Sequence, residues 1–120
     1  MELDTAIKGI ISVRERIASS WDNPVELSDL GNKMATYNAH LGDHLGQLEE
    51  EREVNKGKAY LQCLKNGMSA TASDNHSRAQ TSETYGQIKR LKLMHSDADT
   101  QVSMIQSRLK VLENQLRGSY

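Results

Sequence analysis

Large aromatic side chains and proline are scarce in this chain of 120 residues. It has no phenylalanine, one tryptophan and four tyrosines, whereas a compact globular core of this size usually holds more large aromatic side chains. Long helices that share a narrow seam of leucine, isoleucine and methionine do not need them. The single proline also favours long helices, because proline interrupts the interior of a helix.

A strong charge of one sign and long apolar runs are missing too. The formal net charge of -1 gives no overall electrostatic attraction to nucleic acid or to a membrane. No apolar run approaches the roughly 20 residues of a membrane span, and the first residues do not resemble a signal peptide. The lone Cys63 excludes an internal disulfide and fits a reducing compartment. We therefore expect a single soluble, cytoplasmic domain over residues 1–120 that does not bind a membrane.

Helix-start signals organise the first half of the chain. A first helix is expected over residues 5–19, where apolar residues recur every three or four positions. The clearest signal follows it at Asn23, Pro24 and Glu26. Asparagine is a favoured N-cap, proline fits the first helical position, and a glutamate three residues after the cap can bond back to it. A second helix is therefore expected over residues 24–66.

The second helix carries an apolar seam with steps of three or four residues, as in a coiled coil. The seam consists of Leu27, Leu30, Met34, Tyr37, Leu41, Leu45 and Leu48, and after a polar stretch it is expected to resume at Val54, Leu61, Leu64 and Met68. Four glycines in this helix each lower the helix propensity by about 1 kcal/mol relative to alanine. They mark either close helix contacts or a break at which the chain folds into a compact bundle.

A third helix is expected over residues 72–117, opened by a capping box at residues 71–74 and ended by a strong leucine repeat. If helices two and three fold back on each other, the glutamates of residues 49–51 lie opposite the basic residues of 89–92. Complementary charges set the register of coiled coils. The expected fold is all-α: a short N-terminal helix and two long antiparallel helices that form a coiled-coil-like hairpin.

The thin part of such a hairpin buries little apolar surface by itself, so we expect self-association, with a dimer favoured. The expected oligomer seam consists of Leu41, Leu45, Leu48, Ile88, Leu91 and Met94.

Three histidines are the only metal-ligand candidates. His40 and His44 have a metal-competent spacing on one helix, and the hairpin register brings His95 near His44. The alternative, which we prefer, is a polar layer that fixes the register of the seam. Cys63 and His76 could approach each other as a nucleophile pair, but a free cysteine beside an apolar seam is usually a small buried hydrophobe. We therefore expect no metal, no cofactor, no catalytic residue and no enzyme activity.

A band of basic residues offers contacts to phosphate groups. It consists of Arg52, Lys56, Lys58, Lys89, Arg90 and Lys92. The neighbouring glutamates largely cancel its field, and no aromatic stacking platform accompanies it. Nucleic-acid binding therefore stays an alternative.

The C-terminal part resembles a known group of proteins. Residues 85–94 and 101–120 are similar to small uncharacterised helical-hairpin accessory proteins of tailed bacteriophages, whose ending reads Ile-x-x-Arg-Leu-x-Val-Leu. The matching residues here are Ile105, Arg108, Leu109, Val111 and Leu112. The resemblance implies an accessory protein in the host cytoplasm and carries over no catalytic residue.

The expected function is that of an oligomeric, phage-encoded adaptor or accessory factor that binds another protein. One alternative is a nucleic-acid accessory factor in phage replication or recombination. Another is an inhibitor of a host defence enzyme.

Overall fold

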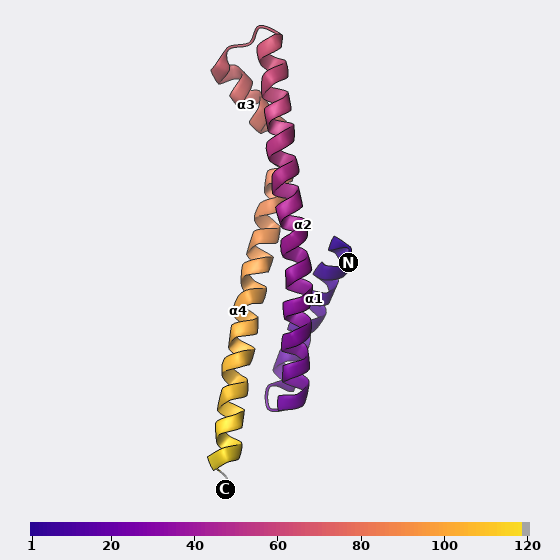
Figure 1. Cartoon of the computed structure of the whole chain (residues 1–120), viewed down its shortest axis with the longest axis vertical. Helices are drawn as coiled ribbons and strands as arrows, with labels where there is room; N and C mark the ends of the chain where they lie inside the picture. The colour runs from indigo at the N-terminus through magenta and orange to yellow at the C-terminus, as the bar shows by residue number, and fades with distance from the viewer. Residues whose placement is uncertain (119–120) are drawn as a thin grey trace. The chain divides into compact units, whose positions relative to one another are not determined.

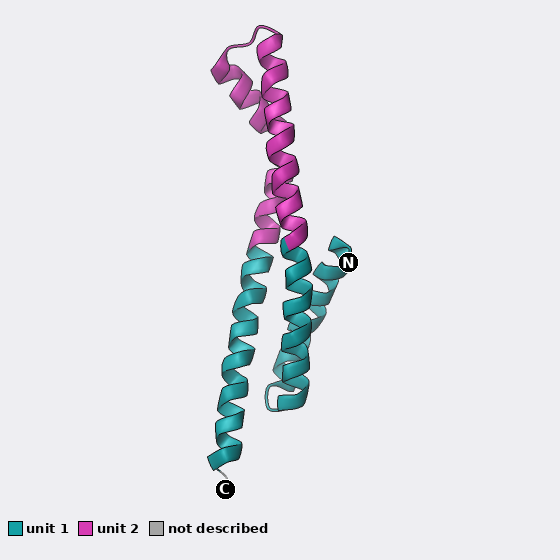
Figure 2. Cartoon of the chain, viewed as in Figure 1, with its two compact units in different colours: residues 1–42, 93–120 teal, residues 43–92 magenta. Residues whose placement is uncertain are grey.

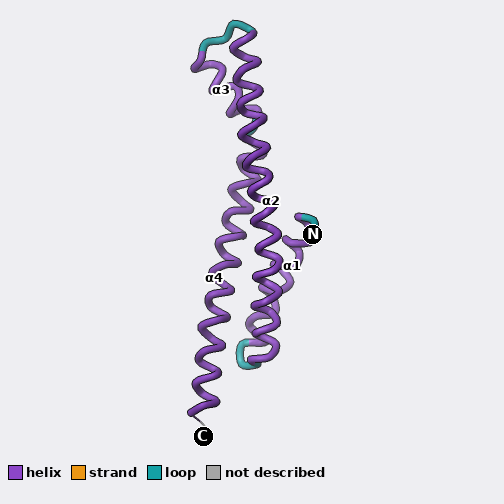
Figure 3. The backbone as a smooth tube through the Cα atoms, viewed as in Figure 1, coloured by secondary structure: helices purple, strands orange, loops and turns teal. Residues whose placement is uncertain are grey.

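The computed structural model describes residues 1–118, and this part of the chain is helical with no strand (Figure 3). The elements are α1 (Leu3–Ile17), the short 3-10 helix η1 (Ala18–Ser20), α2 (Pro24–Lys65), α3 (Ala70–Gln80) and α4 (Ser82–Gly118), shown in Figure 1. The predicted all-α class is confirmed. None of the helices in residues 1–118 is both long and apolar enough to cross a membrane.

Local capping chemistry sets both ends of α2. The backbone N–H of Glu26 donates to Asn23 Oδ1 at 3.1 Å, so Asn23 is the N-cap as predicted. The Glu26 side chain does not bond back to the cap; it accepts a hydrogen bond from the Ser20 hydroxyl at 3.2 Å. At the other end Gly67 has a φ of 85°, and the N–H of Met68 donates to the carbonyl of Cys63. These are the features of a glycine-terminated helix.

The third predicted helix is divided, contrary to the expectation of one helix over residues 72–117. Ser69, rather than residue 71, caps α3: its hydroxyl accepts from the Ala72 N–H at 3.1 Å. The division falls at Thr81, whose hydroxyl donates to the carbonyl of Ser77 at 3.0 Å. Nearby, the Ser82 hydroxyl donates to the carbonyl of Ala79. Thr36 and Thr100 form the same kind of hydroxyl bond inside unbroken helices, so this bond does not explain the break. The break is a backbone feature: Thr81 has a φ of -105° and a ψ of 11°, and its N–H donates to the Arg78 carbonyl.

The chain forms two compact units, coloured in Figure 2: unit 1 (Met1–Gly42 and Leu93–Tyr120) and unit 2 (Asp43–Lys92). Unit 1 contains α1, the first part of α2 and the last part of α4. Its buried apolar residues are Ala6, Ile10, Val13, Leu27, Leu30, Met34, Leu41, Ala98, Ile105 and Leu112. Leu27 clusters with Leu112, and Leu109 packs against this cluster.

Glycines mark close helix contacts in unit 1. A Cβ on Gly31 would lie 3.0 Å from Ile105 Cγ2, and a Cβ on Gly42 would lie 3.0 Å from His95 Nε2. In both cases α2 approaches a side chain of α4. Because α2 runs unbroken through all four of its glycines, none of them breaks the helix. Gly31 and Gly42 serve close contacts, whereas a Cβ on Gly46 or Gly57 would meet no atom within 4 Å.

Unit 2 contains the last part of α2, α3 and the start of α4. Its buried apolar side chains are Leu45, Cys63, Ile88 and Leu91. The surface that α3 buries is made of small polar residues, because Ser73 and Ser77 are fully buried and Thr81 is nearly so. The predicted pairing of acidic and basic runs is confirmed at one place, where Lys92 Nζ lies 3.2 Å from Glu49 Oε1.

Candidate functional site

An open apolar groove lies between the end of α1 and α4 in unit 1, and we call it the α1–α4 groove. Its volume is about 630 Å³. It is lined by Arg14, Ile17, Ala18, Trp21, Asp22, Asp97, Thr100, Gln101 and Met104. A second hollow of about 510 Å³ shares Trp21, Thr100 and Met104 with the first and continues along α4 to Val111. The two hollows therefore form one depression along the helix.

The spacing of the lining residues explains the shape of the groove. Positions 97, 100, 101, 104, 107, 108 and 111 follow each other at helical steps, so they form one face of α4. That face lies beside the core face, which carries Ala98, Ile105 and Leu112. On the other wall, residues 14, 17, 18 and 21 follow the same steps. Two adjacent helical ridges leave a valley between them, and such a valley accepts the ridge of another helix.

The floor of the groove is apolar and partly open. Trp21 and Ile17 are half-buried, and both pack against the cluster of Leu27, Ile105 and Leu112. Met104 is 52% exposed although it follows the groove-facing steps of α4. Tryptophan is enriched among the residues that dominate binding energies, and methionine adapts its shape to different partners.

Trp21 is held in place by Arg108. The Arg108 Nε–H donates to the Trp21 carbonyl at 3.0 Å, and the guanidinium carbon lies 5.5 Å from the centre of the indole ring. A second nitrogen of Arg108 pairs with Asp22. The tryptophan is therefore ordered before any partner arrives, which lowers the entropic cost of binding.

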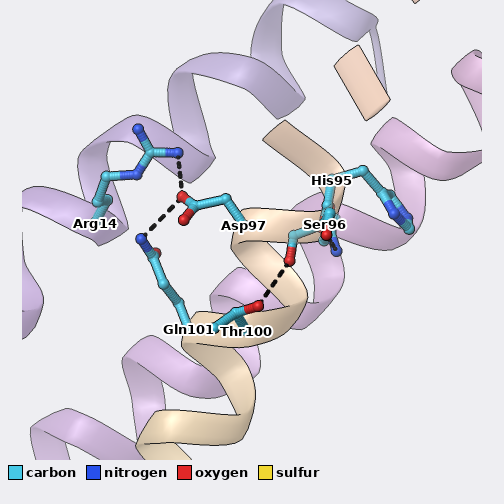
Figure 4. Close-up of polar contacts among 7 residues, drawn as sticks. Arg14, His95, Ser96, Asp97, Thr100 and Gln101 are labelled. Carbon is cyan, nitrogen blue, oxygen red and sulfur yellow. Dashed lines mark hydrogen bonds and ion pairs between the residues drawn. The ribbon is translucent and has the colours of Figure 1, made fainter. Parts of the chain in front are cut away.

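A second ion pair lies at the other rim of the groove. Arg14 Nη2 lies 2.9 Å from Asp97 Oδ2, and Gln101 Nε2 donates to the same carboxylate oxygen at 3.1 Å (Figure 4). Exposed pairs of this kind contribute only about 0–1 kcal/mol to stability. Their consequence here is electrostatic: each rim charge already has a partner of opposite sign.

Comparison with known proteins adds no relative. No family model, curated protein or solved structure matches the chain. The function must therefore be inferred from the residues themselves.

A buried polar layer joins α2 and α4 in unit 1. The Asn38 amide is 3% exposed and donates to the His95 carbonyl at 3.1 Å and to Asp99 Oδ1 at 2.8 Å. His95 Nδ1 lies 3.8 Å from the other carboxylate oxygen of Asp99. Sequence reasoning assigned the seam position to Tyr37 and missed Asn38. The helical spacing allowed either residue at the seam, because Tyr37 lies three residues after Met34 and Asn38 lies four residues after it.

The three histidines considered as metal-ligand candidates fall in both units. His40 and His95 belong to unit 1 and His44 to unit 2, and all three are half-buried. Within residues 1–118, no group of three or more His, Cys, Asp or Glu side chains is arranged to hold a metal ion. Cys63 is a buried free thiol and His76 is exposed; both line a hollow of unit 2.

The basic band lies in unit 2, and the structure adds an aromatic residue to it. Arg52 lies 4.7 Å and Lys89 Nζ 5.5 Å from the centre of the exposed Tyr85 ring. The sequence did not place Tyr85 with the band, because the pairing of α2 with α4 within unit 2 is what brings Tyr85 beside Arg52. Ion pairs hold Lys92 to Glu49 and Arg52 to Glu53. Of the other band residues, Lys56 is half-buried, whereas Lys58 and Arg90 are exposed.

Most of the residues predicted to form an oligomer seam serve the core of a single chain. Leu41, Leu45, Ile88 and Leu91 are buried within their own units. Leu48 and Met94 are half-buried. In this conformation the four buried leucine and isoleucine side chains offer no surface to a second copy.

Proposed function

We propose that this protein is a non-enzymatic adaptor that binds an amphipathic helix of a partner protein in the α1–α4 groove. The observation that carries the proposal is the half-buried Trp21, held by Arg108 at the edge of an open apolar groove. Burying a large apolar side chain contributes roughly 1.5–3 kcal/mol, so covering Met104 and Val111 supplies a useful driving force. Nothing in the groove requires a reaction to be catalysed.

The chemistry of the groove indicates what kind of helix it accepts. Its walls are helical ridges, so the partner presents apolar residues at three- and four-residue steps. Arg14 and Arg108 are already paired with Asp97 and Asp22, so the partner need not carry a complementary charge. Small or neutral residues beside its apolar stripe would leave these pairs intact.

Other expectations from the sequence belong to the same proposal. They are the coiled-coil-like hairpin of two long helices, homo-oligomerisation, a bacteriophage origin and a place in the host cytoplasm. The hairpin is supported within each unit, where the colours of Figure 1 show that α2 and α4 run in opposite directions. The rest are predictions that the resemblance and the composition motivate.

A photo-reactive amino acid at Ser103, which lines the groove, is expected to cross-link one partner protein in a lysate of the source organism. The same amino acid at Ser28, an exposed serine of α2 outside the groove, is the matched control. Adding Met104→Glu should reduce the cross-link about tenfold, because a buried charge replaces an apolar contact. Mass spectrometry then identifies the cross-linked segment.

The synthetic peptide of that segment provides the decisive measurement. Trp21 is the only tryptophan of the chain, so its fluorescence reports directly on the groove. We expect the peptide to become helical and to shift the Trp21 emission to shorter wavelength. Equal cross-linking from Ser28, or a peptide that leaves the emission unchanged, would rule out the groove as the binding site. The identity of the partner would also distinguish a host defence enzyme from a phage protein.

A second candidate function, contact with single-stranded nucleic acid, is supported by Tyr85 beside Arg52 and Lys89. Stacking of a base on an aromatic ring contributes about 1–3 kcal/mol. Tyr85→Ala should therefore weaken binding of a fluorescent oligothymidine about tenfold in fluorescence anisotropy at low salt. Lys33→Glu, a charge change in unit 1, should have a much smaller effect. Absence of binding at low salt, or equal effects of the two variants, would exclude this function.

A further inference from the structure

A second apolar stripe lies on α2 within unit 2, far along the chain from the groove residues of α1. Val54, Leu61 and Leu64 are exposed, and Leu61 is 57% exposed. Val54 and Leu61 are seven residues apart. Gly57 follows Val54 by three residues, and Leu64 follows Leu61 by three. This is the a and d spacing of a coiled-coil heptad. We call these four residues the outer stripe.

The outer stripe is separate from the face of α2 that forms the core of unit 2. That core face includes Leu45 and Cys63, which are both buried. Successive helical residues are turned by about 100°, which places Val54 and Leu61 on the side of α2 opposite Cys63. α3 borders one flank of the stripe, where Asp74 and Ser77 share a hollow with Gly57, and Val54 and Leu61 lie away from this hollow. In the described part of the chain, the apolar side chains of the stripe, Val54, Leu61 and Leu64, are therefore left exposed.

We propose that the outer stripe binds the outer stripe of a second copy of this chain, with the two helices antiparallel. In an antiparallel pair an a position of one helix packs beside a d position of the other. Leu61 then packs on Gly57 of the second copy, and Val54 packs on Leu64. A Cβ placed on Gly57 would meet no atom within 4 Å, so the glycine leaves room for the incoming leucine. A parallel pair would instead place the two glycines together and leave a void.

Charge complementarity supports the same orientation. Glu51, Lys58 and Lys65 occupy the positions that flank the a residues of the stripe, and all three are exposed. In the antiparallel pair Glu51 of each copy lies opposite Lys65 of the other. The two Lys58 side chains lie nearest the two-fold axis, where their length lets them extend into solvent. Two opposite-charge pairs favour this register over displaced ones.

The dimer does not depend on the α1–α4 groove, so the two proposals can fail separately. Sedimentation velocity of the full chain over a range of concentrations should show a monomer that becomes a dimer. Leu61→Glu should raise the dissociation constant at least about tenfold, because it places two charges in the apolar seam. Leu93→Glu, at an exposed leucine of α4 in unit 1, is the matched control and should leave the constant unchanged. Circular dichroism checks that both variants keep their helix content.

Two further experiments test the role of Gly57 and the antiparallel orientation of the two helices. Gly57→Leu should weaken the dimer while the monomer stays folded, whereas Gly46→Leu, at a second open glycine of α2, should not. In a Cys63→Ser background, an oxidised mixture of Val54→Cys and Leu64→Cys chains should form mainly mixed disulfide dimers. A monomer at all concentrations, a dimer unaffected by Leu61→Glu, or disulfides only between identical variants would each overturn the proposal.

Discussion

Ile105→Ala is expected to lower the free energy of unfolding by about 2–5 kcal/mol. Ile105 is 1% exposed and clusters with Leu27 and Leu112. Its Cγ2 would lie only 3.0 Å from a Cβ on Gly31, so Ile105 packs closely against the α2 backbone at this glycine. No flexible side chain at Gly31 can move into the cavity that alanine would leave. Urea unfolding followed by circular dichroism and by Trp21 fluorescence measures the loss.

The neighbouring residue provides the control. Met104→Ala truncates a side chain of similar size on the same turn of α4, but Met104 faces the α1–α4 groove and is largely exposed. Exposed substitutions usually change stability by less than about 0.5 kcal/mol. Equal losses for the two variants would mean that α4 presents a different face to the core. The pair therefore separates the face that stabilises the fold from the face proposed to bind a partner.

The predictable parts of the fold depend on signals that act over a few residues. Asn23 caps α2 and Gly67 ends it because their own conformations and nearest backbone groups decide the outcome. The break at Thr81 was not predicted, although it is local as well. Threonine is compatible with a helix interior, as Thr36 and Thr100 show, and only the backbone of Thr81, whose N–H donates to the Arg78 carbonyl, shows that the ladder is interrupted there.

The candidate site was harder to predict because it depends on a second face of each helix. Hydrophobic periodicity identifies the core stripe of α4, which contains Ile105 and Leu112. Met104 and Val111 each precede one of these core residues by one position and stand among polar residues. Only the position of α1 beside them shows that they line the groove. Tyr85 was missed for a related reason: its neighbour Arg52 lies on another helix.

At Tyr37 a contact with Gly9, far away in the sequence, accompanies the choice of which residue faces the seam between α2 and α4. A step of three from Met34 places Tyr37 in the core, whereas a step of four places Asn38 there. The structure buries Asn38 and directs the Tyr37 ring onto Gly9 of α1. A Cβ on Gly9 would lie 2.5 Å from Tyr37 Cε1 and 2.6 Å from two other ring atoms. The absence of a side chain at Gly9 therefore allows α1 to pack on the tyrosine.

Gly9→Ala is accordingly expected to lower the free energy of unfolding by about 1–3 kcal/mol, the usual cost of overpacking. A loss of stability is unusual for a glycine-to-alanine change in a helix, because alanine is favoured there over glycine by about 1 kcal/mol. Gly46→Ala is the matched control: its Cβ would meet no atom within 4 Å, so the propensity gain should appear as added stability. Thermal and urea unfolding of both variants measure the two opposite shifts.

A double-mutant cycle assigns the loss to the ring itself. In a Tyr37→Ala background the clash is gone, so Gly9→Ala should become neutral or stabilising. The coupling energy should then approach the full cost of overpacking, within the range of about 0.5–3 kcal/mol found for residues in contact. If Gly9→Ala stabilises the protein as Gly46→Ala does, α1 does not pack on Tyr37. The wall of the α1–α4 groove that α1 contributes would then lose its support, since the same helix carries Arg14 and Ile17.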